Sequence, residues 1–391
     1  RSSDLKVDFF AGYPITPATD VMQFLAQHLP TLGGQVIQVE DEIASLGACL
    51  GASFTGAKSM TATSGPGLSL MVELLGLASM VEMPVVVVDV QRGGPSTGLP
   101  TKSENGDLNL AALGAHGDAP RVVVAPANVV DCFYDTVGAF NLSEAYQTPV
   151  IVLSDQSMAM RAQAMPVPDM DAVELRYRKL VDDDDAADYR RYALTTDGVS
   201  AVALPGTGTR AYHMITGLSH DEQGYPSTND GPLSVAMMHK RQRKIDAVRS
   251  EPGWSRLHGP DRARLGVLSW GTCEGAVAEA VDRLNQELPG TVRALHLRLV
   301  WPLPVEEIQA FAATVEQVVV AELNFSGQLN RLVRAETLMP TDLLNKYDGT
   351  PFTPGEIVAH LRGLLPAPVM SVAVPSSTPR RRPTVANPVA K

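Results

Sequence analysis

The N-terminal part of the chain alternates short apolar runs with segments of helical character, and this alternation restricts the fold more than any other feature. Several apolar runs are continuous in valine and isoleucine, such as MPVVVVDVQ (83–91) and TPVIVLSD (148–155). Runs of this kind are typical of parallel strands covered on both faces. The predicted strands lie at 7–13, 35–40, 58–64, 83–91, 121–127 and 148–155, and the predicted helices at 18–29, 41–54, 67–80, 107–115 and 128–146. The pattern predicts an open α/β sheet whose functional loops follow the carboxyl ends of its strands.

The alternation stops near residue 166 and resumes near residue 263. Between these points the chain is broken by proline and glycine, as in functional loops or linkers. It ends in a basic helix, VAMMHKRQRKIDAV (235–248), which we expect to be a solvated face or a subunit contact. Strands are then predicted at 263–271, 292–304 and 317–324, with helices between and after them. The sequence therefore predicts an α/β domain over 1–165, an irregular linker and loop region over 166–262, a second α/β domain over 263–370 and a disordered tail over 371–391.

Composition excludes several classes of function. A net charge of −11 and an isoelectric point near 5.2 argue against a nucleic-acid partner. No apolar run reaches the roughly 20 residues that span a bilayer, and the opening RSSDLKVD is no signal peptide, so we expect no membrane and a cytoplasmic location. The 3 cysteines form no CxxC motif, which predicts buried free thiols and no metal or cluster held by this chain alone. A P-loop and a GxGxxG after the first strand are both absent from the sequence.

Four polar segments stand where predicted strands end. They are Tyr13-Pro14-Ile15-Thr16-Pro17, Glu40-Asp41-Glu42, Thr63-Ser64-Gly65-Pro66-Gly67, and the stretch from Gln91 to Glu104. Each segment also has a purely structural explanation. Glu42 can be an acid that the macrodipole favours in a first helical turn, Ser64-Gly65-Pro66-Gly67 can be a simple turn, and the stretch after Gln91 can be a surface loop whose Arg92 forms an ion pair. Taken one at a time, the segments leave both explanations open.

In order and spacing, these segments resemble the alpha subunit of 2-oxoacid:ferredoxin oxidoreductases, specifically of the 2-oxoglutarate type. The motifs that carry the resemblance are YPITPATD, EDEIASLGACLGAS, TATSGPGLSLM and DVQRGGPSTGLPTKSENGDLN, and TGLSHDEQG adds thinner support. The resemblance implies a pyrimidine-binding domain for thiamine diphosphate (ThDP), followed by a domain like the C-terminal domain of transketolase. It also implies a beta subunit that carries the diphosphate and Mg²⁺ site and a [4Fe–4S] cluster.

The resemblance assigns roles to individual residues. Glu42 would hydrogen-bond the pyrimidine ring and favour the tautomer that takes the thiazolium C2 proton, whereas Glu40 is the less suitable acid. Thr16, held between two prolines, would contact the substrate carboxylate or the adduct beside C2. Arg92 would pair with the carboxylate of the 2-oxoacid, which its guanidinium fork matches.

Further contacts follow from the same motifs. The cofactor-binding set is Tyr13, Pro14, Ile15, Thr16, Glu42, Ser64, Gly65 and Pro66. Ser96, Thr97 and Lys102 are the candidates for the distal carboxylate of a dicarboxylic substrate, because charge and hydrogen-bonding capacity suit it.

The implied reaction is oxidative decarboxylation of 2-oxoglutarate to succinyl-CoA, with electrons passed to ferredoxin and coenzyme A as acyl acceptor. Pyruvate, a branched-chain 2-oxoacid or indolepyruvate remain alternative substrates, and a non-catalytic scaffolding subunit remains an alternative function. Relatives often carry a gamma domain ahead of this region, so we expect a gamma chain or a gamma domain removed from the N-terminus.

Overall fold

The computed structural model describes residues 7–171, 173–182, 188–207 and 211–365, and the predicted disordered tail lies outside them. Every strand and helix predicted before residue 156 is present, with ends that differ by a few residues. The strands are β1 Phe9–Gly12, β2 Gln35–Gln38, β3 Ser59–Thr63, β4 Val85–Gln91, β5 Val122–Val124 and β6 Pro149–Asp155. The helices are α1 Thr19–His28, α2 Glu42–Phe54, α3 Gly65–Met80, α4 Leu108–Leu113, α5 Val129–Tyr146 and α6 Gln156–Ala159, with a 3₁₀ turn, η1, at Leu29–Leu32.

The second α/β unit contains more elements than the sequence predicted. Its strands are β7 Ser255–His258, β8 Leu265–Trp270, β9 Val292–Leu297, β10 Leu299–Trp301, β11 Gln317–Glu322 and β12 Asp342–Asn345. Its helices are α8 Glu274–Glu287, α9 Val305–Ala312, α10 Gln328–Thr337 and α11 Pro354–Leu364, with a 3₁₀ turn, η3, at Gly271–Cys273. The strands β7 and β12 and the helix α11 were not predicted; both strands are only 4 residues long and include charged or amide side chains.

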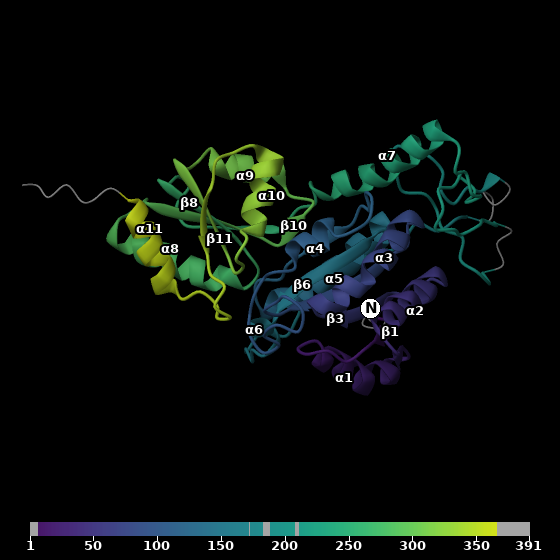
Figure 1. Ribbon diagram of the computed structural model, residues 1–391, viewed down its shortest axis with the longest axis horizontal. Coiled ribbons are helices and arrows are strands. Elements are labelled where there is room, and N and C mark those ends of the chain that lie inside the picture. The colour runs from purple at the N-terminus through teal and green to yellow at the C-terminus, as the bar shows by residue number, and fades with distance from the viewer. Residues whose placement is uncertain (1–6, 172, 183–187, 208–210, 366–391) are drawn as a thin grey trace, which may run out of the picture.

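These elements form two open sheets (Figure 1). The first has 7 strands in the order β10-β5-β6-β4-β3-β1-β2, and the second has 5 in the order β12-β11-β8-β9-β7. Neighbouring strands are parallel except at β10–β5 and β7–β9. The predicted fold class, two mostly parallel α/β units, is confirmed.

The prediction of a single strand over 292–304 is wrong. It is two strands in different sheets, because β9 joins the second sheet whereas β10 pairs antiparallel with β5 in the first. Arg298 stands at the break, where its N–H donates to Trp254 O at 2.8 Å and its guanidinium pairs with Asp135 of α5. The switch joins the two units, and one apolar core runs from α2 and α3 through Val300 to Trp270 of β8.

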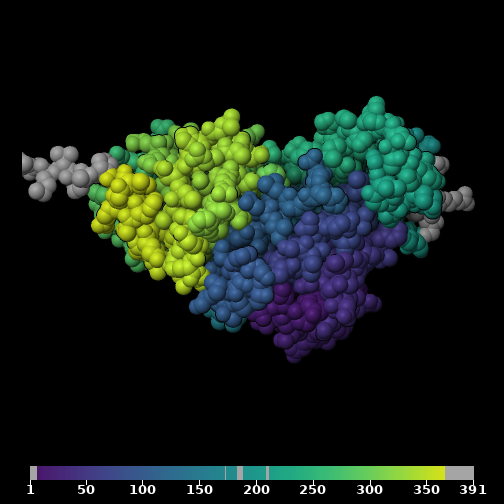
Figure 2. Space-filling model, viewed as in Figure 1, coloured from purple at the N-terminus to yellow at the C-terminus, as the bar shows by residue number. Residues whose placement is uncertain are grey.

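Helices cover both faces of the first sheet. The side chains of α2, α3 and α4 pack on the face that carries Val85 and Val87. On the opposite face, α5, α1 and the C-terminal end of α7 (Gly231–Val248) pack around Val86 and Val90. Figure 2 shows α1 at the lower tip of the molecule and the teal region around α7 as a projection at the upper right. All of β4 except the half-buried Val88 is therefore buried, as its apolar sequence predicts.

The basic helix α7 is not a solvated face or a free subunit contact, and that expectation is corrected. Lys240, Arg241 and Lys244 are all buried. Lys240 Nζ lies 2.6 Å and Lys244 Nζ 2.8 Å from Oε2 of Glu82, a fully buried acid just after α3. One face of this helix therefore anchors the irregular region to the first sheet.

The cysteines are free thiols, as predicted. Cys49 and Cys273 are buried, whereas Cys132 is only half-buried, so the expectation of burial is wrong for that residue. Burial raises the pKa of Cys49 to about 12, which keeps it protonated at neutral pH. In the described part of the chain, no helix combines the length and the hydropathy needed to cross a bilayer.

Candidate functional site

The four polar segments lie side by side at one edge of the first sheet. They follow β1, β2, β3 and β4, which are consecutive neighbours in the order β4-β3-β1-β2, and all of these strands run in parallel. Their carboxyl ends therefore meet at one edge, where open α/β sheets bind ligands. The structure brings together most of the residues that were predicted from separate motifs.

Thr16 and Arg92 are in direct contact. Arg92 Nη1 donates to the main-chain oxygen of Thr16 at 2.5 Å. Arg92 is 8% exposed, and its Nε has no partner among the described residues. Thr16, with Tyr13 and Pro14, is exposed, so the turn presents its side chains outward while its backbone holds the guanidinium.

Glu42 begins α2 but does not cap it. The cap is Asp41, whose Oδ1 accepts from the N–H of Ala44 at 2.7 Å. Glu42 is only 6% exposed, and no described residue forms a hydrogen bond or an ion pair with its carboxylate. The explanation of Glu42 as a helix starter is therefore poor, because Asp41 already fills that position.

The segment Ser64-Gly65-Pro66-Gly67 packs tightly beneath this carboxylate. A Cβ on Gly67 would lie 2.6 Å from Glu42 Oε1 and would also overlap Thr63 Oγ1, so only glycine fits there. The buried Ser64 Oγ has no partner among the described residues. A glycine cradle, a free hydroxyl and a free buried carboxylate fit the aminopyrimidine end of ThDP, which needs close backbone approach and an acid at its ring nitrogen.

Ser96, Thr97 and Lys102 lie on the exposed loop after Arg92. Gly93 closes this loop, because its oxygen accepts from Leu99 N at 2.7 Å and its N–H donates to Lys102 O at 3.1 Å. Lys102 packs against Gly349 of the second unit. Among the described residues, no hydrogen bond joins these three side chains to Thr16 or Arg92, so the structure does not bring them into the Thr16–Arg92 contact.

Two acids at the site were missed by the sequence analysis. They are Asp89, fully buried on β4, and Asp107, directly before α4; burial and then the neighbouring charge of Asp107 raise the pKa of Asp89 well above its ordinary value. Asp107 lies against Gly65, whose Cβ would be 2.7 Å from Asp107 Oδ2. The available signal was an aspartate inside the otherwise apolar run VVVVDVQ.

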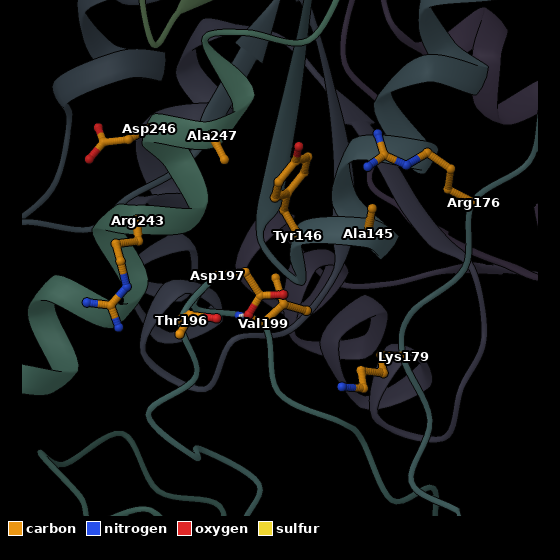
Figure 3. Close-up of a pocket in the computed structure, with 10 residues that line it drawn as sticks. All are labelled: Ala145, Tyr146, Arg176, Lys179, Thr196, Asp197, Val199, Arg243, Asp246 and Ala247. Carbon is orange, nitrogen blue, oxygen red and sulfur yellow. Dashed lines mark hydrogen bonds between the residues drawn. The ribbon is translucent and has the colours of Figure 1, made fainter.

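A separate pocket of about 580 Å³ lies between α5 and α7 (Figure 3). Arg176, Lys179 and Arg243 line it together with Asp197 and Asp246, so its charges are mixed. None of the site residues predicted from the sequence lines this pocket. It belongs to the irregular region and is remote from the strand edge in the fold.

Comparisons with known proteins agree with this geometry. Residues 2–240 match the family model of pyruvate flavodoxin/ferredoxin oxidoreductase, thiamine diphosphate-binding. Residues 263–357 match the model of pyruvate:ferredoxin oxidoreductase core domain II. The first match covers every residue of the four polar segments.

Two curated relatives show how the match extends along the chain. The 2-oxoglutarate synthase subunit KorA of Methanothermobacter marburgensis is 38% identical over 91% of this chain and 94% of that subunit. The alpha subunit of 2-oxoacid:ferredoxin oxidoreductase 2 from Aeropyrum pernix is 37% identical over 90% of this chain. The chain spans only 57% of the length of that second subunit.

Solved structures give the same result. A 2-oxoglutarate:ferredoxin oxidoreductase from Magnetococcus marinus, with 2-oxoglutarate, coenzyme A and succinyl-CoA bound, matches with a TM-score of 0.89 and 47% identity. The match covers 92% of this chain and 62% of that one. A split-gene transketolase matches with a TM-score of 0.52 at 13% identity, which supports the expected transketolase likeness at the level of fold alone.

Proposed function

The chain belongs to the pyruvate flavodoxin/ferredoxin oxidoreductase family, in the group of KorA-type alpha subunits, and from this premise we propose that it forms the pyrimidine half of a ThDP site. The site serves a 2-oxoglutarate:ferredoxin oxidoreductase, which converts 2-oxoglutarate, coenzyme A and oxidised ferredoxin to succinyl-CoA, CO₂ and reduced ferredoxin. The observation that carries the proposal is Glu42, a buried carboxylate with no described protein partner beside a glycine cradle.

In this proposal the residues of the chain orient the cofactor and the substrate, and one of them holds a proton at the pyrimidine ring. When bound, ThDP supplies a carbon nucleophile and an electron sink for decarboxylation. Glu42 holds a proton at the pyrimidine nitrogen, and its near-complete burial excludes water from that hydrogen bond. Ser64, Gly65 and Pro66 bound the ring through close backbone approach, and Tyr13, Pro14 and Ile15 form the opposite rim.

Arg92 and Thr16 bind the substrate. Since Thr16 O already occupies Nη1, the remaining donors of the guanidinium are available to a carboxylate. The Thr16 hydroxyl completes the contact from the same turn. Ser96, Thr97 and Lys102 take the distal carboxylate; this assignment requires the loop over 93–102 to turn its side chains toward Arg92.

The other half of the site comes from a beta-type partner with the Mg²⁺ and diphosphate site and a [4Fe–4S] cluster. Exposed apolar side chains on the segments that form the site support such a partner: Tyr13 follows β1, Ile43 lies on α2 and Leu70 on α3, and they are 41%, 48% and 51% exposed. Ferredoxin, coenzyme A and a gamma-type chain or domain complete the proposed system.

We also propose the division of the chain that the sequence suggests: the ThDP pyrimidine-binding domain over 1–165, the linker and loop region over 166–262 and the transketolase-like domain over 263–370. The buried C-terminal end of α7 and the strand β10 bind the three parts to one another. Limited proteolysis tests this division, with the first cuts expected in the exposed stretch 159–164.

Reconstitution with the cluster-bearing partner tests the proposed function. Coenzyme A-dependent reduction of a redox dye is measured with 2-oxoglutarate, pyruvate, a branched-chain 2-oxoacid and indolepyruvate. We expect the highest kcat/KM with 2-oxoglutarate, and a preference for another 2-oxoacid would replace the substrate assignment. If Glu42→Gln and Arg92→Ala leave turnover intact in the assembled complex, the chain is a scaffold and the catalytic proposal is wrong.

A further inference from the structure

The short helix α4 is capped by a residue of the second α/β unit. Asp107 stands at its N-cap position, where an aspartate usually accepts from an N–H of the first turn, but its side chain makes no such bond. The N–H of Asn109, in that first turn, donates instead to Gln328 Oε1 at 2.8 Å. Gln328 is the first residue of α10 and lies 219 positions later in the chain. The segment over 103–109, which leads into α4, is therefore bound from outside its own unit.

Gln328 uses both ends of its carboxamide on this segment. Its Nε2 donates to Gly106 O at 2.6 Å, while its Oε1 accepts from Asn109. A carboxamide carries both a donor and an acceptor, so a carboxylate or an apolar side chain cannot make both bonds. The side chain is only 9% exposed, and water has little access to either bond. Gln328 therefore fixes the backbone on both sides of Asp107.

The second unit makes further hydrogen bonds along the same segment. Asn105 N donates to Leu323 O at 2.6 Å, and Asn324 Nδ2 donates to Asn105 O at 3.1 Å. Ser103 N donates to Gly349 O at 3.2 Å. These partners in the second unit follow the carboxyl ends of β11 and β12. The segment is thus held at several points, and Asn324 is a second side chain that holds it.

The held segment continues the loop over 93–102 without a break. That loop is closed at its base, because Gly93 N donates to Lys102 O at 3.1 Å. Farther along the segment, the Asp107 carboxylate lies against the glycine cradle of the site, since a Cβ on Gly65 would be 2.7 Å from Asp107 Oδ2. The hydrogen bonds from the second unit therefore set where the loop ends and where this carboxylate lies.

We propose that Gln328 and Asn324 are positioning residues, which hold the segment so that the loop over 93–102 and the Asp107 carboxylate keep a fixed place beside the site. Both act through the backbone of the segment and need not touch the substrate. The inference deepens the proposed function: its effect on substrate binding rests on that proposal, whereas the cap on α4 is a property of this chain alone. Because the distal carboxylate of the substrate is assigned to this loop, loss of the hold should weaken substrate binding more than it slows the chemical steps.

Hydrogen–deuterium exchange on the full chain tests the cap without reference to turnover. Several N–H groups of the held segment donate to other parts of the chain, so peptides over 103–113 should exchange slowly in wild type. Gln328→Met keeps the length of the side chain and removes both hydrogen bonds. We expect exchange of these peptides to accelerate on the order of tenfold, while a peptide over β4 stays unchanged. Unchanged exchange over 103–113 would overturn the proposal.

Kinetics of the assembled complex test the effect on substrate binding. In Gln328→Met, we expect KM for 2-oxoglutarate to rise on the order of tenfold and kcat to stay within about threefold of wild type. Gln328→Glu keeps the acceptor for Asn109 N–H and loses the donor to Gly106 O. Its KM should therefore lie between those of wild type and Gln328→Met. Equal KM values for the two variants, or a fall in kcat as large as the rise in KM, would contradict the positioning role.

Asn285→Leu is the matched control. The carboxamide of Asn285 also bonds two backbone groups of the second unit, accepting from Thr291 N at 3.0 Å and donating to Val292 O at 2.7 Å. It does so where β9 begins, whereas the held segment follows the opposite, carboxyl ends of the strands. This variant should lower Tm and leave both KM and the exchange over 103–113 unchanged.

Two further outcomes are decisive. If Gln328→Met does not fold, Gln328→Glu is compared with wild type by the same two measurements, and unchanged exchange together with unchanged KM would overturn the proposal. If the wild-type complex turns over no 2-oxoacid, the proposed function fails, while the exchange over 103–113 still decides whether Gln328 caps α4.

Discussion

At the scale of single residues, Glu42 is distinguished by what surrounds it. A carboxylate at the start of a helix normally gains about 0.3–1 kcal/mol from the macrodipole and from capping. Here the neighbouring Asp41 makes the capping bond, and Glu42 is buried against Gly67 instead. A buried carboxylate without a protein partner costs free energy, so its retention points to a ligand.

Substitution of this carboxyl tests its role. Glu42→Gln keeps the volume and removes the acid, so we expect turnover of the assembled complex to fall on the order of 10²-fold or more. The Tm of the chain should stay close to wild type, because no described protein contact is lost. Glu40→Gln, an exposed acid two residues earlier, is the control and should keep wild-type turnover. Normal activity of Glu42→Gln would contradict the assignment.

At the scale of elements, the helix α3 carries two glycines with different surroundings. Gly67 lies against Thr63 and Glu42, whereas a Cβ on Gly76 meets nothing within 4 Å. We expect Gly67→Ala to destabilise the chain by about 1–3 kcal/mol through overpacking. Gly76→Ala should stabilise it by about 0.5–1 kcal/mol, because alanine favours the helix. Urea unfolding measures the change in stability of both variants, and a stabilised Gly67→Ala would show that helix propensity outweighs the packing at Gly67.

The sequence predicts strands such as β4 and β6 well because their apolar runs are long and both of their faces are covered. The prediction fails at 292–304, where the sequence shows one apolar run and the structure has two strands, β9 and β10. The change of sheet at Arg298 depends on partners such as Asp135 that are distant in the chain, so the local sequence does not reveal it. The same limit applies to α7. The run of basic residues around Lys240 and Lys244 is typical of a solvated helix face. The ion pairs with Glu82 that bury these lysines arise only in the folded chain.

Some residues of the candidate site could likewise be predicted from the sequence, and others could not. Motif order places Thr16, Glu42 and Arg92 at adjacent strand ends, and the sheet order agrees. Asp89 lies on β4 and Asp107 in a later loop, so no local pattern predicts that the two acids influence each other. Ser96, Thr97 and Lys102 are placed by a loop whose geometry depends on Gly349 of the second unit.

At the scale of the whole molecule, Glu82 ties the irregular region to the first sheet. Burial alone would raise the pKa of Glu82, but Lys244, Lys240 and Arg191 lower it to about 2 from an ordinary 4.5. A lowered carboxyl pKa contributes stability that is present above about pH 4.5 and is lost as pH falls toward 2. The attachment of α7 should therefore weaken in acid.

The free energy of unfolding of Glu82→Gln checks this dependence. Near neutral pH we expect the variant to lose about 3–5 kcal/mol, because Lys240 and Lys244 remain buried without their anion. The difference from wild type should narrow between about pH 4.5 and pH 2, measured by urea unfolding. Glu279→Gln, in an exposed pair with Arg283, is the control and should change stability by no more than about 0.5 kcal/mol. A difference that does not vary with pH would contradict the ionised state of Glu82.

Assembly with a partner is the property of the whole molecule that the exposed apolar residues Tyr13, Ile43 and Leu70 predict. Leu70 of α3 is 51% exposed, so Leu70→Glu should leave the folding of the chain itself unchanged. In the complex, the new carboxylate would be buried without a partner, and we expect the Kd for the beta-type subunit to rise on the order of 10²-fold. Leu257→Glu, on β7 of the second unit and 57% exposed, carries the same change away from these site segments and should leave that Kd nearly unaltered. Sedimentation of both variants with the partner separates the outcomes: wild-type assembly of Leu70→Glu would place the interface elsewhere, and the ThDP site would then need a different second half.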